Sequence, residues 1–180
     1  MYSNEYLLFT GKTNKYNELL KDFTNVDYAI KYDDQKDIFY FQIPDWLDTA
    51  WIHLSWKDMQ QLRKNFEKYF EWESVAIKNE AEIKKDLPDT TITTNITWNS
   101  GDNWYYDKNF VLNFVFFSQS KTYHQLVLHT SKATGSNRFA TYKIDGFYFD
   151  KSQVQKLYDG IEENKLKEQV QNFKKERKLI

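Results

Sequence analysis

Short runs in which apolar and polar residues alternate recur along this chain, and no other feature limits its possible folds so strongly. In residues 26–32, Val26, Tyr28, Ile30 and Tyr32 take every second position. A period of two places such residues on one face of a β-strand. Further strands are predicted over residues 5–10, 38–43, 50–55, 91–98, 110–117, 123–130 and 138–149.

Two longer stretches have helical periodicity and begin with capping signals. Ser55 and Asp58 form an S-x-x-[DE] capping box, in which each residue satisfies a free backbone N–H of the other. Apolar residues behind the box recur every three or four positions, which predicts a helix over residues 57–72. Asp150 is predicted to cap a second helix.

These elements predict an α+β fold of two pseudo-repeated ββββα halves, each an antiparallel sheet with helices packed on one face. The first half spans residues 1–72 and includes a short inserted helix at residues 14–23, where four apolar residues have the spacing i, i+3, i+4, i+7. Residues 73–89 are predicted to be a connector and residues 90–164 the second half. Residues 165–180 are expected to form a basic C-terminal helix or tail.

The two strand-to-helix junctions align without a gap at an offset of 95 residues, residues 52–69 over residues 147–164. Gln60 then matches Gln155, and Leu62 matches Leu157. A twofold tandem repeat explains this alignment. Two unrelated junctions that follow the same patterning rules explain it equally well.

The composition excludes several classes of protein. Twenty-five basic and 26 acidic residues give a net charge of −1, which excludes a uniformly basic protein that coats DNA. The absence of cysteine excludes disulfides and thiol chemistry, and no apolar run is long enough for a membrane span. The N-terminal apolar patch is too short for a signal peptide, so we expect a soluble cytoplasmic protein.

Motifs that carry catalysis or bind cofactors are incomplete. Gly11-Lys12-Thr13 matches the end of a phosphate-binding loop, but Tyr6 stands where the first glycine of that motif is required. The three histidines lack zinc-ligand spacing, and no G-x-S-x-G motif occurs. We therefore expect a non-enzymatic protein with no cofactor and no metal, and a hydrolase with a dispersed site is the third interpretation.

The second half concentrates aromatic and basic residues around one predicted turn. Residues 1–89 have a net charge of −5, whereas residues 90–180 have a net charge of +4. Bases stack on aromatic rings, and lysine or arginine side chains neutralise phosphates. The same residue types also anchor protein partners. The candidate binding residues, expected on exposed loops, are Trp98, Trp104, Tyr105, Tyr106, Lys108, Lys121, Lys132, Arg138 and Lys143.

The tandem ββββα order of elements resembles the PUR-repeat, PC4 and Whirly group of folds that bind single-stranded nucleic acid. The resemblance covers most of the chain and rests on element order. It implies a curved antiparallel sheet that presents aromatic and basic side chains, with a helix on its other face.

Two functions follow from these features. The first is single-stranded nucleic-acid binding through the aromatic and basic loops of the second half. The second is a small protein inhibitor from a phage or mobile element, similar to an anti-CRISPR or immunity protein. Its acidic first half would bind a basic surface of a complex that handles nucleic acid.

Overall fold

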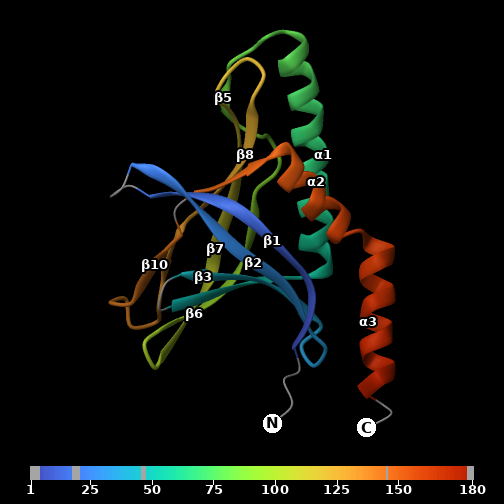
Figure 1. Ribbon diagram of the computed structural model, residues 1–180. Helices are drawn as coiled ribbons and strands as arrows, with labels where there is room; N and C mark the ends of the chain where they lie inside the picture. Colours follow the sequence, from blue (N-terminus) through green and yellow to red (C-terminus); the bar gives the residue numbers. More distant parts are fainter. Residues whose placement is uncertain (1–4, 18–20, 46–47, 145, 178–180) are drawn as a thin grey trace.

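The computed structural model describes residues 5–17, 21–45, 48–144 and 146–177 (Figure 1). Within these residues the chain is an α+β protein, in which a closed eight-stranded antiparallel barrel carries three helices. The barrel strands are β1 (Glu5–Asn17), β2 (Asp22–Asp33), β3 (Ile38–Asp45), β4 (Asp48–Leu54), β6 (Ile92–Ser100), β7 (Asn103–Ser118), β8 (His124–Thr130) and β11 (Phe147–Asp150).

Each barrel strand pairs with the next one along the chain, and the pairing of β11 with β1 closes the ring. Strand β5 (Lys84–Asp86) adds to β7 outside the ring. Strands β9 (Lys132–Thr134) and β10 (Thr141–Lys143) form a separate hairpin. The helices are α1 (Trp56–Lys78), α2 (Lys151–Gly160) and α3 (Glu163–Arg177).

The barrel interior is a filled apolar core of leucine and aromatic side chains. Inward-facing residues of the strands meet Leu62 and Phe66 of α1 and Leu157 of α2. The free space among these side chains is only about 20 Å³, which is room for roughly one water molecule. A ligand-binding role therefore has to be sought on the outside of the molecule.

The predicted capping box at Ser55 and the predicted cap at Asp150 are confirmed, and Asp150 also forms a capping box. The Ser55 Oγ accepts a hydrogen bond from the Asp58 N–H at 3.1 Å, and the Asp58 carboxylate accepts one from the Ser55 N–H at 2.9 Å. Asp150 and Gln153 make the same pair of bonds at the start of α2, at 2.8 and 2.9 Å. These bonds satisfy backbone N–H groups that have no partner inside the helix.

The predicted helix at residues 14–23 is wrong for the part that the structure describes. Residues 14–17 continue β1, residues 22 and 23 begin β2, and residues 18–20 lie outside the described residues. Tyr16 and Phe23 face each other across the hairpin with ring centroids 5.3 Å apart. The ring of Tyr148 on β11 packs on Phe23 at 5.0 Å, so aromatic packing between strands explains the apolar spacing.

Three predicted boundaries also change. Helix α1 extends through Lys78, and β5 follows it, so residues 73–89 are not only a connector. The predicted strand over residues 138–149 is two strands, because its first part folds back on β9 while its second part joins the barrel. The predicted C-terminal helix is present as α3, whose Phe173 stacks on Tyr6 with ring centroids 4.3 Å apart.

The prediction of two separate sheets is also wrong. Strand β4 pairs with β6 across the two halves, and β1 pairs with β11, so all eight strands form one ring. Closure leaves no long unpaired edge in the described part of the ring, which removes the sites at which sheets aggregate. None of the described helices is long and apolar enough to cross a membrane.

Candidate functional site

The predicted aromatic loop is the beginning of strand β7, where successive side chains point to opposite faces of the sheet. Trp104 and Tyr106 point outward, with 61% and 40% of their surfaces exposed. Tyr105 points to the other face and is half-buried. Trp98 is 1% exposed and stacks against Tyr105 and Tyr142, with ring centroids 5.6 and 6.0 Å apart. Trp98 is therefore a core residue, and its expected exposure on a loop is wrong.

The predicted basic residues do not form one cluster. Lys108 is exposed on β7, two residues after Tyr106. Lys121 follows the far end of β7 and makes an ion pair with Glu80 at 3.5 Å. The remaining three, Lys132, Arg138 and Lys143, belong to the β9–β10 hairpin and its loop.

The register of the barrel places residues from the first half beside Trp104 and Tyr106. Trp51 on β4 lies opposite Thr97 on β6, which in turn lies opposite Tyr106 on β7. Two positions further along β4, His53 lies opposite Tyr40 on β3. These positions share the outer side of the sheet because side chains alternate along each strand.

The rings at these positions contact one another and form one surface, which we call the outer aromatic face. The ring centroids of Trp51 and Trp104 are 4.9 Å apart. His53 lies 5.0 Å from the Tyr40 ring and 6.2 Å from the Tyr106 ring. The face therefore spans strands β3 to β7 and joins both halves of the chain.

An open hollow of about 280 Å³ lies on this face. Its walls include the rings of Tyr40, Trp51, His53 and Trp104. For scale, a cavity of roughly 150 Å³ can hold benzene, so the hollow has room for a planar ring. Polar groups at its rim are Glu5, Lys36 and Thr97.

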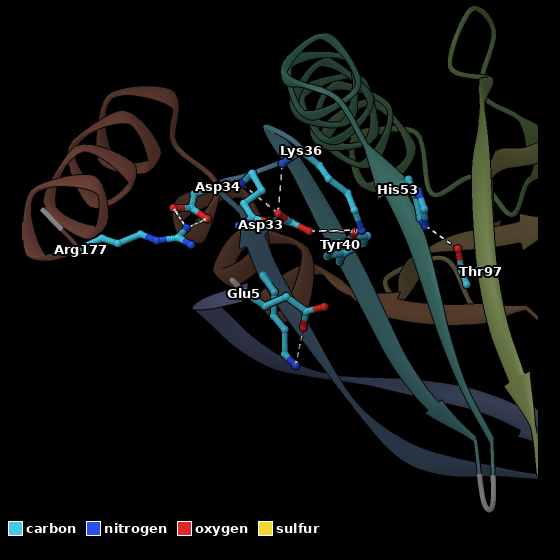
Figure 2. Close-up of polar contacts among 10 residues, drawn as sticks. Glu5, Asp33, Asp34, Lys36, Tyr40, His53, Thr97 and Arg177 are labelled. Carbon is cyan, nitrogen blue, oxygen red and sulfur yellow. Dashed lines mark hydrogen bonds and ion pairs between the residues drawn. The ribbon is translucent and has the colours of Figure 1, made fainter. Parts of the chain in front are cut away.

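Lysines and carboxylates are paired along one side of the hollow (Figure 2). The Lys36 Nζ lies 3.0 Å from the Tyr40 hydroxyl oxygen and 3.4 Å from an Asp33 carboxylate oxygen. The Lys31 Nζ lies 3.4 Å from a Glu5 carboxylate oxygen. These pairs nearly balance the charge. Among the rings of the hollow, Trp104 is exposed, Trp51 and His53 are half-buried, and Tyr40 is buried.

His53 is held in its neutral form. The pKa of its imidazole is lowered to about 4, first by burial and then by the charge of Lys36, while the charge of Asp33 acts in the opposite direction. Its Nε2 lies 2.8 Å from the Thr97 Oγ1, as Figure 2 shows. A neutral imidazole adds a flat, uncharged ring to the face at pH 7.

The C-terminal helix reaches the same end of the sheet. Arg177 on α3 forms an ion pair with Asp34, which lies next to Asp33 in the loop between β2 and β3 (Figure 2). Among the described residues, no group of three or more histidine, aspartate or glutamate side chains is arranged to hold a metal ion. The arrangement is suited to planar, apolar contact with hydrogen-bonding groups at its rim.

Three residues of the outer aromatic face, Tyr40, Trp51 and His53, were not predicted because binding residues were sought only in the second half. A usable signal was present. Trp51 and His53 alternate with Ile52 and Leu54, so two rings stand on the side of β4 that faces away from the core. No protein family, curated protein or solved structure matches this chain.

Proposed function

We propose that this protein is a non-enzymatic binder of single-stranded nucleic acid and that bases stack on the outer aromatic face. The observation that carries the proposal is the exposed pair Trp104 and Tyr106, which are next-but-one neighbours on β7. The Trp104 ring packs on Trp51, and the Tyr106 ring packs on His53. Each base that stacks on an aromatic ring contributes about 1–3 kcal/mol to binding. Stacking is tolerant of sequence because every base has a flat face.

The basic residues beside the face set the expected dependence on salt. Lys31, Lys36 and Lys108 lie on or next to it, and the first two are partly neutralised by Glu5 and Asp33. With about three phosphate contacts, the slope of log K against log salt is expected to be about −2 for a single strand. Such a shallow slope distinguishes stacking from binding dominated by charge.

The order of elements supports the same proposal through the resemblance to the PUR-repeat, PC4 and Whirly folds. Each half contributes four strands to the barrel, and a capped helix follows each set. We propose that the halves are related repeats whose capping boxes at Ser55 and Asp150 occupy equivalent positions.

The test is a fluorescence-anisotropy titration with labelled single strands of DNA and RNA, about 12 nucleotides long to match the span of one binding site, at two salt concentrations. Trp104→Ala and Tyr106→Ala are each expected to weaken binding about 5- to 150-fold. Tyr123→Ala is the matched control, because Tyr123 is 40% exposed, like Tyr106, but lies beyond the other end of β7. Absence of binding at low salt, or equal losses in the control, would overturn the proposal.

A protein inhibitor is the second candidate, and the exposed rings favour it. Trp104 and Tyr106 are 61% and 40% exposed, and tryptophan and tyrosine also anchor protein partners. The net charge of −5 in residues 1–89 would favour a basic partner surface. If nucleic acid does not bind, recovery of one stoichiometric protein partner that Trp104→Ala fails to retain would establish this function instead.

A further inference from the structure

The β9–β10 hairpin carries the most exposed of the large apolar side chains in the described part of the chain. Phe139, in the loop that joins the two strands, is 92% exposed. The hairpin projects from the barrel on the side away from the helices (Figure 1). An aromatic ring in this position makes almost no contact with its own protein, so packing within the chain does not explain it.

The stem of the hairpin is fixed to the barrel. Tyr142 stacks on Trp98 with ring centroids 6.0 Å apart, and Ala133 beside it is fully buried. The Thr134 N–H donates to the Asp107 carboxylate at 2.8 Å. The base of the hairpin is therefore held in place by contacts with strands β6 and β7.

The loop that presents Phe139 is also ordered by hydrogen bonds. The Asn137 side-chain oxygen accepts from the N–H groups of Phe139 and Ala140 at 3.1 and 3.0 Å. The Gly135 N–H donates to the Ala140 carbonyl at 2.7 Å and closes the loop. The ring is thus held out from the protein by a defined turn, which lowers the entropy lost when it binds a partner.

The charge of the hairpin indicates what that partner is. Residues 132–144 contain Lys132, Arg138 and Lys143 and no acidic residue. Lys132 and Lys143 lie directly opposite each other across the two strands, an arrangement that is unfavourable for like charges. No ion pair among the described residues involves any of these three cations. An anionic partner would relieve the repulsion.

We propose that this hairpin is a wedge for the junction between single-stranded and double-stranded nucleic acid. Phe139 would stack on the terminal base pair of the duplex, as apolar wedges do when they insert at base steps. Lys132, Arg138 and Lys143 would contact the adjacent phosphates. This inference rests on the proposed function, since it requires that the single strand bind the outer aromatic face.

Strand β7 connects the two surfaces. Tyr105 and Asp107 hold the hairpin, since Gly135 lies against the Tyr105 ring and Thr134 is bonded to Asp107. Trp104 and Tyr106, which alternate with them, belong to the outer aromatic face. The hairpin and the outer aromatic face therefore lie on opposite sides of β7, and a single strand that leaves a duplex at Phe139 would pass around this strand to reach Trp104.

The experiment compares the affinity of the protein for three probes that carry the fluorescent label at the same position. They are a single strand, a blunt duplex, and a duplex with a single-stranded tail. The wild-type protein is expected to bind the tailed duplex at least about 5-fold more tightly than the single strand. Phe139→Ala should abolish this preference and leave single-strand affinity within about twofold, whereas Phe139→Trp should retain it. Because Phe139 is exposed, its replacement is not expected to alter the urea midpoint, which serves as the folding control.

A 2-aminopurine base at the end of the duplex reports stacking directly. Its fluorescence should change when wild-type protein binds and not when Phe139→Ala binds. Equal affinity for single strand and tailed duplex would overturn the wedge and leave the proposed function intact. Loss of single-strand binding in Trp104→Ala together with an unchanged affinity for the tailed duplex would also overturn it, because the two surfaces would then act separately. Binding of a protein partner that Phe139→Ala abolishes, without any nucleic-acid binding, would overturn both proposals.

Discussion

Replacement of Trp98 tests the assignment of this residue to the core. Its indole is 1% exposed and lies between the rings of Tyr105 and Tyr142. It therefore connects β6 with both β7 and the β9–β10 hairpin. Trp98→Ala should destabilise the fold and release the hairpin, whereas Trp98→Phe should keep part of the ring packing.

The magnitude follows from what the substitution removes. Truncation of a buried tryptophan to alanine costs about 3–5 kcal/mol, and each aromatic pair contributes about 0.5–1.5 kcal/mol beyond the buried area. Because alanine stacks on neither Tyr105 nor Tyr142, we expect about 4–5 kcal/mol for Trp98→Ala and about 1–3 kcal/mol for Trp98→Phe. A domain is typically stable by only about 5–15 kcal/mol, so the alanine variant is close to unfolding.

Urea unfolding monitored by circular dichroism gives the free energies, and single-strand binding is measured on Trp98→Phe under native conditions. This variant should bind nucleic acid as wild type does, since Trp98 does not reach the surface. Loss of binding by Trp98→Phe at unchanged stability would refute the reasoning and restore the surface role expected from the sequence.

Three further predictions concern pH, capping and close packing. The pKa of His53 is about 4 in the folded protein and about 6.5 in an unfolded chain. Between these two values the unfolded chain binds a proton that the folded protein does not, so the free energy of unfolding falls as the pH falls from about 6.5 to 4. The difference in unfolding free energy between wild type and His53→Gln should therefore shrink by about 1 kcal/mol between pH 7 and pH 5, after allowance for solvent screening; a constant difference would contradict this. Ser55→Ala and Asp150→Ala should each cost about 1 kcal/mol in urea unfolding and should add in the double variant. Gly160→Ala places a Cβ 2.6 Å from the Phe9 ring, which should cost about 1–3 kcal/mol and be partly relieved by Phe9→Leu, whereas equal losses with and without Phe9→Leu would exclude this clash.

Local patterns predicted most of the elements. The alternation in residues 26–32 lies within strand β2, the apolar run in residues 38–43 lies within β3, and capping residues mark the starts of α1 and α2. These signals depend on neighbours within a few residues, so the sequence displays them directly. The spacing of Tyr16 and Phe23 satisfied a helical rule by coincidence, since their contact is made across two strands.

The candidate site was harder to predict because it depends on pairing between distant strands. Trp51 and Trp104 are 53 positions apart in the sequence and meet only because β4 pairs with β6. Trp98 was misplaced although its alternation with Ile96, which is fully buried, already indicated the inner face. Periodicity identifies a face, but only the pairing of strands shows which face is covered.

The seam between β1 and β11 has a consequence for synthesis of the chain. The first strand finds its second neighbour more than 130 residues later, through the pairs Asn14–Tyr148 and Lys15–Phe147 and a bond from the Thr13 hydroxyl to the Tyr148 carbonyl at 3.0 Å. A nascent chain that ends after α1 therefore carries two unpaired strand edges, on β1 and on β4. Edge-to-edge association of such chains competes with closure of the ring until the last barrel strand leaves the ribosome.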